Sequence, residues 1–293
     1  TLIDNEDILT EVTNNDFEGA VIKLKSDSKL LINGNGTLLI DGSKCKNGIK
    51  GASSTDVVID DKNLELNVLA NKNGINSDGS ITINNGTINI NVSGDGIKSE
   101  PGSDDEVSSG AIIISGGSIN VIAQGDAIQG ANKIVITDGI LNIKTLDGYD
   151  SQDFDDEGMS CKGLKASSSE REDVQNEILI SGGKLFFNCA DDAIHSDGNI
   201  NIKSGIFEIS TGDDAIHADF KLDLGMENEK NDKLKINVTN CREGIEGSII
   251  NIYSGTYHIV AKDDGINVAN KNLVDYEGFS LCIYNADIYI DSG

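Results

Sequence analysis

Short segments of alternating apolar and polar residues recur along most of the chain. Residues 80–83 read SITI, a turn follows at Asn85-Gly86, and residues 87–92 then read TININV. Alternation with a period of two, carried by β-branched residues, predicts β-strands with one buried face. The same plan returns at residues 200–209 and 250–259. The pattern therefore predicts an all-β protein built from pairs of short strands.

A short anchor precedes these strand pairs and recurs nine times. Each anchor is Gly or Ala followed by Ile or Leu, and three of the eight intervals between anchors are 21 or 22 residues. A repeat of this length with three short strands is typical of one coil of a parallel β-helix, whose coils stack about 4.8 Å apart. The larger anchor residues are Ile49, Ile75, Ile97, Ile128, Leu164, Ile194, Ile216, Ile245 and Ile266.

The repeats predict a single domain over residues 1–293, a single-stranded right-handed parallel β-helix of about ten coils. Equivalent apolar residues of successive coils are expected to form ladders inside the helix. Residues 1–20, which include Ile3, Ile8 and Leu9, are expected to cap the N-terminal end of this core. The last coil ends at Gly293, where the next acidic corner is due, so we expect the natural chain to continue.

Acidic residues flank the anchors at fixed positions, so the β-helix register stacks them in columns. Carboxylates about 5 Å apart repel by roughly 3 kcal/mol at an effective dielectric constant near 20. Few lysines or arginines are evident in these columns, and calcium accepts 6–8 oxygen ligands, so we predict calcium sites there. The densest set is Asp191, Asp192, Asp197, Asp213, Asp214 and Asp219; further candidates are Asp78, Asp95, Glu100, Asp126, Glu243, Asp263 and Asp264.

The alternative is a solvated acidic face whose Asp side chains cap their own turns. This alternative explains isolated Asp-Gly pairs well. It explains paired acids that recur in register less well, and we therefore favour the metal.

The overall charge limits the possible partners. With 23 Lys and Arg against 49 Asp and Glu, the formal net charge is −26. Nucleic acids and anionic membrane surfaces require clustered basic residues, so neither is expected as a direct partner. No apolar run approaches the ~18 residues of a membrane span, so we expect no membrane insertion. The five cysteines are widely spaced and are expected to be free and buried. We expect a monomer.

Five further residues are candidates for ligand contacts. His195 and His217 both follow Asp-Asp-Ala-Ile and are expected to stack on one another, either as a sugar contact or proton carrier or as a simple outward pair. Tyr253 and Tyr284 occupy equivalent outward positions, so they form either a sugar-stacking strip or edge-protecting surface aromatics. Arg242 is either an ion-pair partner of Asp213 or Asp263, or a catalytic base.

The segments from Asp191 to Gly198 and from Gly212 to Asp219 share Asp-Asp-Ala-Ile-His with strand–turn–strand spacers. From about Gly36 to its end, the chain resembles the bacterial β-helical carbohydrate-binding domain family of cellulolytic anaerobes. The resemblance implies a pectate-lyase-like architecture, bound Ca²⁺, and binding of cellulose and polygalacturonate without cleavage. It also implies a secreted protein, extracellular or at the cell surface.

Three other functions stay open beside this non-catalytic, calcium-dependent polysaccharide-binding protein. A pectate-lyase-like enzyme would use calcium and a basic residue, with Arg242 as the candidate and Lys162 interpreted as a charge-balancing residue. An inverting polygalacturonase-like hydrolase would need two carboxylates about 6.5–9.5 Å apart, but the chain lacks the Gly-His-Gly and Arg-Ile-Lys motifs of those enzymes. A calcium-stiffened surface stalk or adhesin would bind no sugar.

Overall fold

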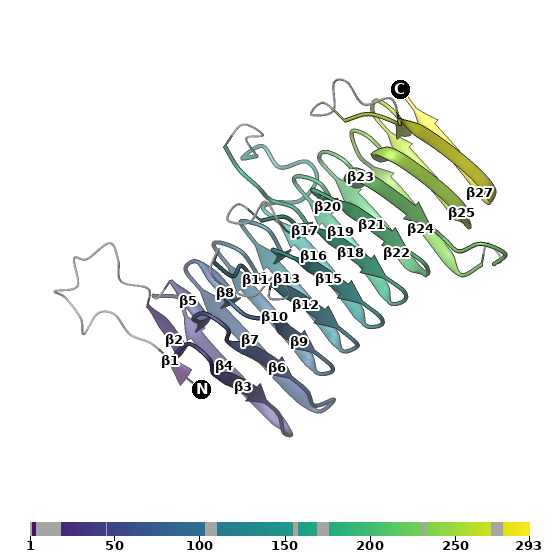
Figure 1. Cartoon of the computed structure of the whole chain (residues 1–293). Helices are drawn as coiled ribbons and strands as arrows, with labels where there is room; N and C mark the ends of the chain where they lie inside the picture. The colour runs from purple at the N-terminus through teal and green to yellow at the C-terminus, as the bar shows by residue number, and fades with distance from the viewer. Residues whose placement is uncertain are drawn as a thin grey trace.

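The structure, a computed structural model, describes residues 2–3, 19–44, 46–102, 110–154, 158–168, 176–229, 232–270 and 278–293. These residues form 27 strands and no helix, and the chain winds through ten successive coils (Figure 1). Neighbouring coils pair through parallel strands, for example β7 with β10 and β10 with β13. The predicted all-β parallel β-helix is confirmed.

Three parallel sheets form the walls of the helix. The anchor sheet contains β2 (Ala20–Leu24), β5 (Asn47–Gly51), β8 (Asn73–Ser77), β11 (Ile97–Ser99), β14 (Ile128–Gly130), β17 (Leu164–Ala166), β20 (Ile194–Ser196) and β26 (Ile266–Asn267). The second sheet contains β3 (Lys29–Ile32), β6 (Asp56–Ile59), β9 (Ile81–Ile83), β12 (Ala111–Ile114), β15 (Lys133–Ile136), β18 (Glu177–Ile180) and β21 (Asn199–Ile202).

The third sheet carries the longest outer face. It contains β1 (Leu2–Ile3), β4 (Gly36–Gly42), β7 (Leu64–Ala70), β10 (Thr87–Val92), β13 (Ser118–Ala123), β16 (Ile140–Thr145), β19 (Lys184–Cys189), β22 (Gly205–Thr211) and β24 (Leu234–Asn240). Near the C-terminal end, strands run on from one sheet into the next: β23 (Ile216–Leu224), β25 (Ile245–Ala261) and β27 (Ser280–Ser292).

The anchor residues stack in one continuous column, as the repeat predicts. Ile97 pairs with Ile75 on one side and with Ile128 on the other, and the column continues to Ile266. Ile22 adds a tenth member, which pairs with Ile49. The sequence pattern missed Ile22 because Val21 precedes it in place of Gly or Ala.

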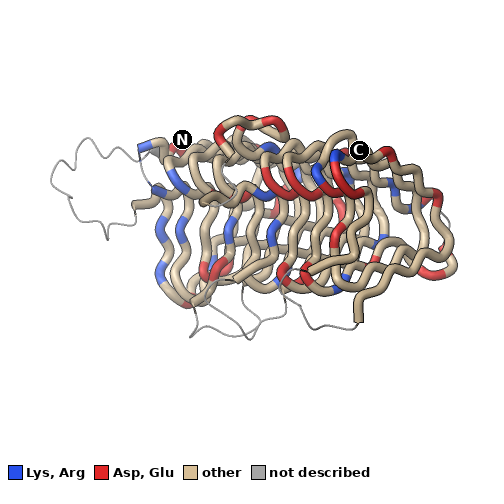
Figure 2. Tube along the Cα trace, turned by 90° about the horizontal axis from the view of Figure 1, so that it is seen from above, with Lys and Arg blue, Asp and Glu red and all other residues tan. Residues whose placement is uncertain are grey.

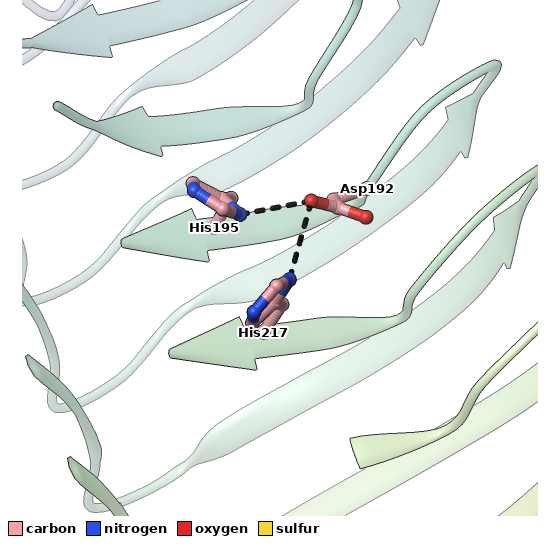
Figure 3. A group of neighbouring side chains, drawn as sticks. All are labelled: Asp192, His195 and His217. Atoms are coloured by element: carbon pink, nitrogen blue, oxygen red, sulfur yellow. Dashed lines mark hydrogen bonds and ion pairs between the residues drawn. The ribbon is translucent and has the colours of Figure 1, made fainter. Parts of the chain in front are cut away.

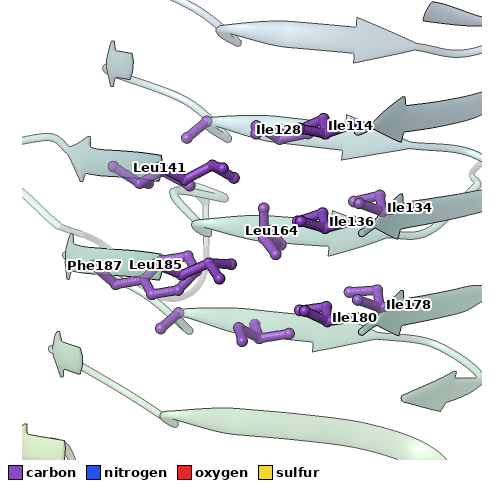
Figure 4. Packing of buried hydrophobic residues seen from close by; sticks show 14 of the residues in the cluster. Ile114, Ile128, Ile134, Ile136, Leu141, Leu164, Ile178, Ile180, Leu185 and Phe187 are labelled. Carbon is purple, nitrogen blue, oxygen red and sulfur yellow. The ribbon is translucent and has the colours of Figure 1, made fainter. Parts of the chain in front are cut away.

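The ladders fill the interior with Ile, Leu and Val side chains (Figure 4). Each fully buried side chain of this kind contributes about 1.5–3 kcal/mol, and the rows of one coil pack directly on those of the next. The small residue before each anchor also has a steric cause. A Cβ atom at Gly48 would lie 2.5 Å from Val68 Cγ1 and 2.8 Å from the carbonyl oxygen of Gly74 on the next coil.

The predicted N-terminal cap lies mostly outside the described residues. Leu2 and Ile3 pair with Ile40 and Asp41 of β4, while residues 4–18 are not described, so the cap stays a prediction. Among the described cysteines, Cys161, Cys189 and Cys241 are free and buried, and Cys282 is free and half-buried. Over the described ranges, no helix has the length and apolar character needed to cross a membrane.

Candidate metal centre at the acidic corner

The acids that precede the anchors have a structural role that the sequence did not reveal. Their side-chain oxygens accept hydrogen bonds from the backbone N–H of the equivalent residue on the next coil. This corner ladder buries carboxylates at the edge where the third sheet leads into the anchor sheet. Its bonds run from Asp95 N to Asn73 Oδ1 (3.0 Å), from Asp126 N to Asp95 Oδ1 (3.0 Å), from Lys162 N to Asp126 Oδ1 (2.9 Å) and from Asp214 N to Asp192 Oδ1 (3.0 Å).

The acidic columns themselves contain few cations, as expected, but a neighbouring column supplies several. The residue directly after each anchor Ile or Leu forms its own column, and several members are basic (Figure 2 shows the charges along the coils). Lys98 Nζ lies 3.2 Å from Asp95 Oδ2 and 2.8 Å from Glu100 Oε2. In the same column, Lys50 Nζ lies 2.7 Å from Asp78 Oδ1, and Lys165 Nζ lies 3.1 Å from Asp126 Oδ2.

These ion pairs involve four of the predicted calcium ligands. Asp78, Asp95, Glu100 and Asp126 each have a lysine ammonium in contact, so the protein itself supplies a compensating charge there. Their role as calcium ligands stays a prediction, and a metal would compete with a lysine at each of them.

His195 and His217 take the place of lysine in this column. His195 Nδ1 lies 2.9 Å from Asp192 Oδ2, and its Nε2 lies 3.0 Å from Asp197 Oδ1. His217 Nδ1 lies 3.3 Å from Asp214 Oδ2 and 3.9 Å from Asp192 Oδ2. Figure 3 shows both imidazoles turned toward Asp192, and their rings meet edge to face with centroids 4.8 Å apart. The predicted stacking of the two histidines is therefore confirmed.

The histidines hold protons in this setting. Burial alone would lower the pKa of His217, but hydrogen bonds to Asp214 and Asp219 outweigh it and raise the pKa to about 11. The pKa of His195 is raised in the same way by Asp192 and Asp197, against the effect of burial. A protonated imidazole cannot ligate a metal. The two histidine-containing groups of close ligand atoms, around Asp192 and around Asp214, would therefore have to release protons from the imidazoles before they bound a metal.

Lys162 interrupts the acidic column and neutralises two buried carboxylates. Its Nζ lies 2.6 Å from Asp191 Oδ1 and 2.7 Å from Asp192 Oδ2. Burial would raise the pKa of Asp192, but Lys162 and the neighbouring histidines outweigh it and hold the pKa well below its usual range. The same carboxylates raise the pKa of Lys162, against the effect of burial. The interpretation of Lys162 as a charge-balancing residue is confirmed.

One coil further on, a third carboxylate joins Asp191 and Asp192. Asp191, Asp192 and Asp213 each place an oxygen within 4.8 Å of the other two. Burial and the neighbouring charges of Asp214 and Asp192 raise the pKa of Asp213 to about 7. In addition, the buried Asp214 Oδ1 has no hydrogen-bond partner among the described residues. A group of three carboxylates and the unpaired oxygen of the neighbouring Asp214 thus lie close together here.

This donor set offers the oxygen ligands of a hard divalent cation, which would share Asp191 and Asp192 with Lys162. Oxygens that share one Ca²⁺ at 2.3–2.6 Å lie no more than about 5 Å apart, which matches the 4.8 Å limit of the three carboxylates. Arg242 reaches the group only at its outer side, where Nη1 lies 3.2 Å from Asp213 Oδ1, and the guanidinium is mostly exposed. Arg242 therefore pairs with Asp213, one of its two predicted partners.

The next coil departs from the pattern. Glu246 occupies the column position held by Lys98 and the histidines, in register with His217. Burial and a hydrogen bond with Glu243 raise the pKa of Glu246 to about 8. Sequence reasoning did not single out Glu246, although its position directly after the anchor Ile245 was visible. Asp263 and Asp264 of the following coil are exposed and lie outside the three-carboxylate group.

The tyrosine strip also forms, with a consequence for sugar binding. The rings of Tyr253 and Tyr284 stack with centroids 5.2 Å apart and planes inclined by 10°. Tyr289 stacks on His258 in the same manner, at 5.0 Å and 12°. Stacked rings turn their faces toward each other. The strip therefore presents ring edges outward and offers a flat sugar ring a face only at the ends of each stack.

The family comparison covers both the acidic corner and most of the third sheet. A family model described as carbohydrate-binding domain-containing protein matches residues 1–215, which is 215 of the 293 residues. The match includes Asp191, Asp192 and Asp213 and ends before Arg242 and the tyrosines. Neither a curated protein nor a solved structure matches the chain significantly. Because the matched segment is well over half of its length, the chain belongs to the family of carbohydrate-binding domain-containing proteins.

Proposed function

We propose that this member of a carbohydrate-binding family is a non-catalytic protein that binds plant cell-wall polymers, both cellulose and acidic polymers such as polygalacturonate, and that it binds the acidic ones through Ca²⁺ at the acidic corner. The observation that carries the proposal is the group formed by Asp191, Asp192 and Asp213, whose oxygens lie within 4.8 Å of one another. We further propose that the protein acts as a secreted or surface-bound monomer, where such polymers are found.

The charges at the corner explain why a cation is needed. An acidic polymer and a protein of net charge −26 repel each other. Bound Ca²⁺ would supply coordination positions that uronate carboxylates can occupy. Lys162 orients Asp191 and Asp192 by bonding one oxygen of each, and Arg242 offers an exposed guanidinium beside Asp213. A carboxylate is recognised well by such a planar donor.

The state of the basic residues supports binding over lyase chemistry. A lyase base must be neutral in order to abstract a proton. Lys162 bonds two buried carboxylates that raise its pKa, and Asp213 raises the pKa of Arg242. Both residues are therefore held in their protonated forms, which supports a non-catalytic role.

The test is binding of polygalacturonate, measured by affinity electrophoresis in calcium and in excess chelator. We expect retardation in calcium, its loss in chelator, and a large loss for Asp213→Asn. Asp263→Asn is the matched control, because Asp263 is an exposed acid two coils beyond Asp213. Retardation that persists in chelator would contradict the calcium mechanism. An unsaturated product would favour a lyase, and no retardation under any condition would favour a stalk.

A further inference from the structure

We propose that the outer face of the third sheet is a second carbohydrate site, which takes a neutral, extended polysaccharide chain and needs no metal. The inference rests on the proposed polysaccharide-binding function, but it concerns a different face of the coils. The strands of the third sheet end a few residues before the corner acids, so the two sites lie on neighbouring faces of the same coils.

Two adjoining cavities hollow this face. Their volumes are about 410 and 310 Å³, and both are lined by Asn120 and Ile122, so they form one groove, here called the amide groove. The residues that line the groove lie on β4, β7, β10, β13, β16, β19, β22 and β24. Seven strand spacings of about 4.8 Å make it roughly 34 Å long. Its direction follows the helix axis because the strands stack in register, which suits a straight chain of several sugars.

A ladder of asparagine amides runs along the groove. Asn89 Nδ2 donates to Asn67 Oδ1 at 2.8 Å, Asn120 Nδ2 to Asn89 Oδ1 at 2.7 Å, and Asn142 Nδ2 to Asn120 Oδ1 at 2.8 Å. Each amide has two N–H donors and an oxygen that can accept two bonds. Within the ladder, Asn89 and Asn120 each use one N–H donor and one acceptor position of the oxygen. The second N–H and the second acceptor position of each amide form a row of fixed donors and acceptors that matches the hydroxyl groups of a sugar chain.

Apolar side chains continue the groove where the amide ladder ends. Phe186 is the register partner of Asn142, so an aromatic ring replaces the next amide, and 37% of Phe186 is exposed. Ile122 lines the same groove and is 43% exposed. Pyranose rings have apolar C–H faces as well as hydroxyl groups. A surface that alternates amides with exposed hydrocarbon therefore suits a saccharide better than a protein helix or a lipid.

The charge of the groove selects against ions. Of the residues that line the two cavities, Lys144 and Glu208 are charged, and their charges cancel. The protein as a whole carries −26, and the acidic corner is crowded with carboxylates. A neutral groove on such a protein neither attracts a cation nor distinguishes a polyanion, so we infer an uncharged glycan.

The family match favours this groove over the tyrosine strip. Residues 1–215 contain the amide ladder and Phe186, whereas Tyr253 and Tyr284 lie beyond the matched segment. The two stacked tyrosines also cover one face of each other's ring. On the preceding coil, the neighbour of Phe186 is Asn142 and not a second aromatic ring.

The experiment is isothermal titration of the full chain with cellohexaose in excess chelator. We expect binding that Phe186→Ala and Asn120→Ala each weaken at least tenfold, with unfolding midpoints checked for both. Phe186→Leu removes the ring but keeps an apolar side chain, and it should weaken binding without loss of fold. Tyr284→Ala is the control and should bind as the unsubstituted chain does. Maltohexaose, whose α-linked chain curls, should bind weakly.

Three results would overturn the groove: no cellohexaose binding by the unsubstituted chain, binding that chelator abolishes, or groove variants that bind normally. Calcium-dependent retardation by polygalacturonate is measured on the same variants. It should be unchanged in Phe186→Ala and lost in Asp213→Asn, so failure of the groove and failure of the corner are distinguishable.

Discussion

Removing the lysine at the corner should destabilise the protein far more than removing an ordinary surface lysine. Lys162 contacts Asp191 at 2.6 Å and Asp192 at 2.7 Å, and both carboxylates are buried. In Lys162→Ala, these carboxylates keep their buried positions but lose the ammonium. Breaking a buried ion pair by removing one partner costs about 3–5 kcal/mol, because the remaining charge is left without compensation.

The pH dependence of this loss follows from the pKa of Asp192. Its pKa is lowered in the folded protein, so the charged form adds stability above the unfolded-state pKa of ~3.9. That contribution is lost as pH falls through the folded-state pKa. Without Lys162 the carboxylates take up protons more readily. The difference between the two proteins should therefore be larger at neutral pH than at pH 3.

The assay is urea unfolding followed by circular dichroism at pH 7 and at pH 3, with chelator present. Lys133→Ala is the matched control, because Lys133 pairs with Glu177 at 3.4 Å while both side chains are about one-third exposed. Such an exposed pair contributes about 1 kcal/mol or less. If Lys162→Ala loses no more stability than Lys133→Ala, the account of Lys162 as the cation of a buried cluster is refuted.

Three further predictions concern the corner and the core. The pKa of Asp213 is raised to about 7, so the stability of the metal-free protein should fall as pH rises from ~4 to 7, and Asp213→Asn should flatten that fall in melting curves. Glu246, with its pKa raised to about 8, costs stability as pH rises toward 8; Glu246→Gln, which cannot ionise, should flatten this fall in urea unfolding between about pH 5 and 8, whereas an unchanged fall would contradict this reasoning. Ile128→Ala should cost about 2–5 kcal/mol because Ile128 is fully buried, and Ile122→Ala, at an exposed position, should cost much less; equal losses would contradict the ladder as the source of stability.

The anchor register could be predicted because one residue class is required at one position of every coil. Ile97 and Ile128 are buried in the same column, and a one-residue slip of either strand would turn its side chain out of the core. The exception is Ile22, whose preceding residue is Val21, so a search for Gly or Ala followed by Ile could not find it.

The column of residues that directly follow the anchors, which supplies lysines and histidines to the acids, was missed for a different reason. Lys98, Gln129, His195 and Glu246 share one structural position but no chemical class, so only the strand register shows that they are equivalent. The acids were visible because they recur as the same residue type. The repulsion argued from them alone was therefore too large, since the pairing of Lys50, Lys98 and Lys165 with these acids had not been identified.

The amide ladder was visible in the sequence and was not used. Asn89, Asn120 and Asn142 each lie between two buried apolar residues at the same place in a repeat. Stacked coils bring such amides within hydrogen-bond distance. The groove itself could not be predicted, because its depth depends on how the exposed side chains beside Phe186 pack in three dimensions.

The most direct measurement is a crystal structure of the protein with calcium and an oligogalacturonate. The account predicts a calcium ion held by carboxylate oxygens of Asp191, Asp192 and Asp213, with a uronate carboxylate on the same ion. A structure in which the sugar is bound while this group holds no ion would contradict it.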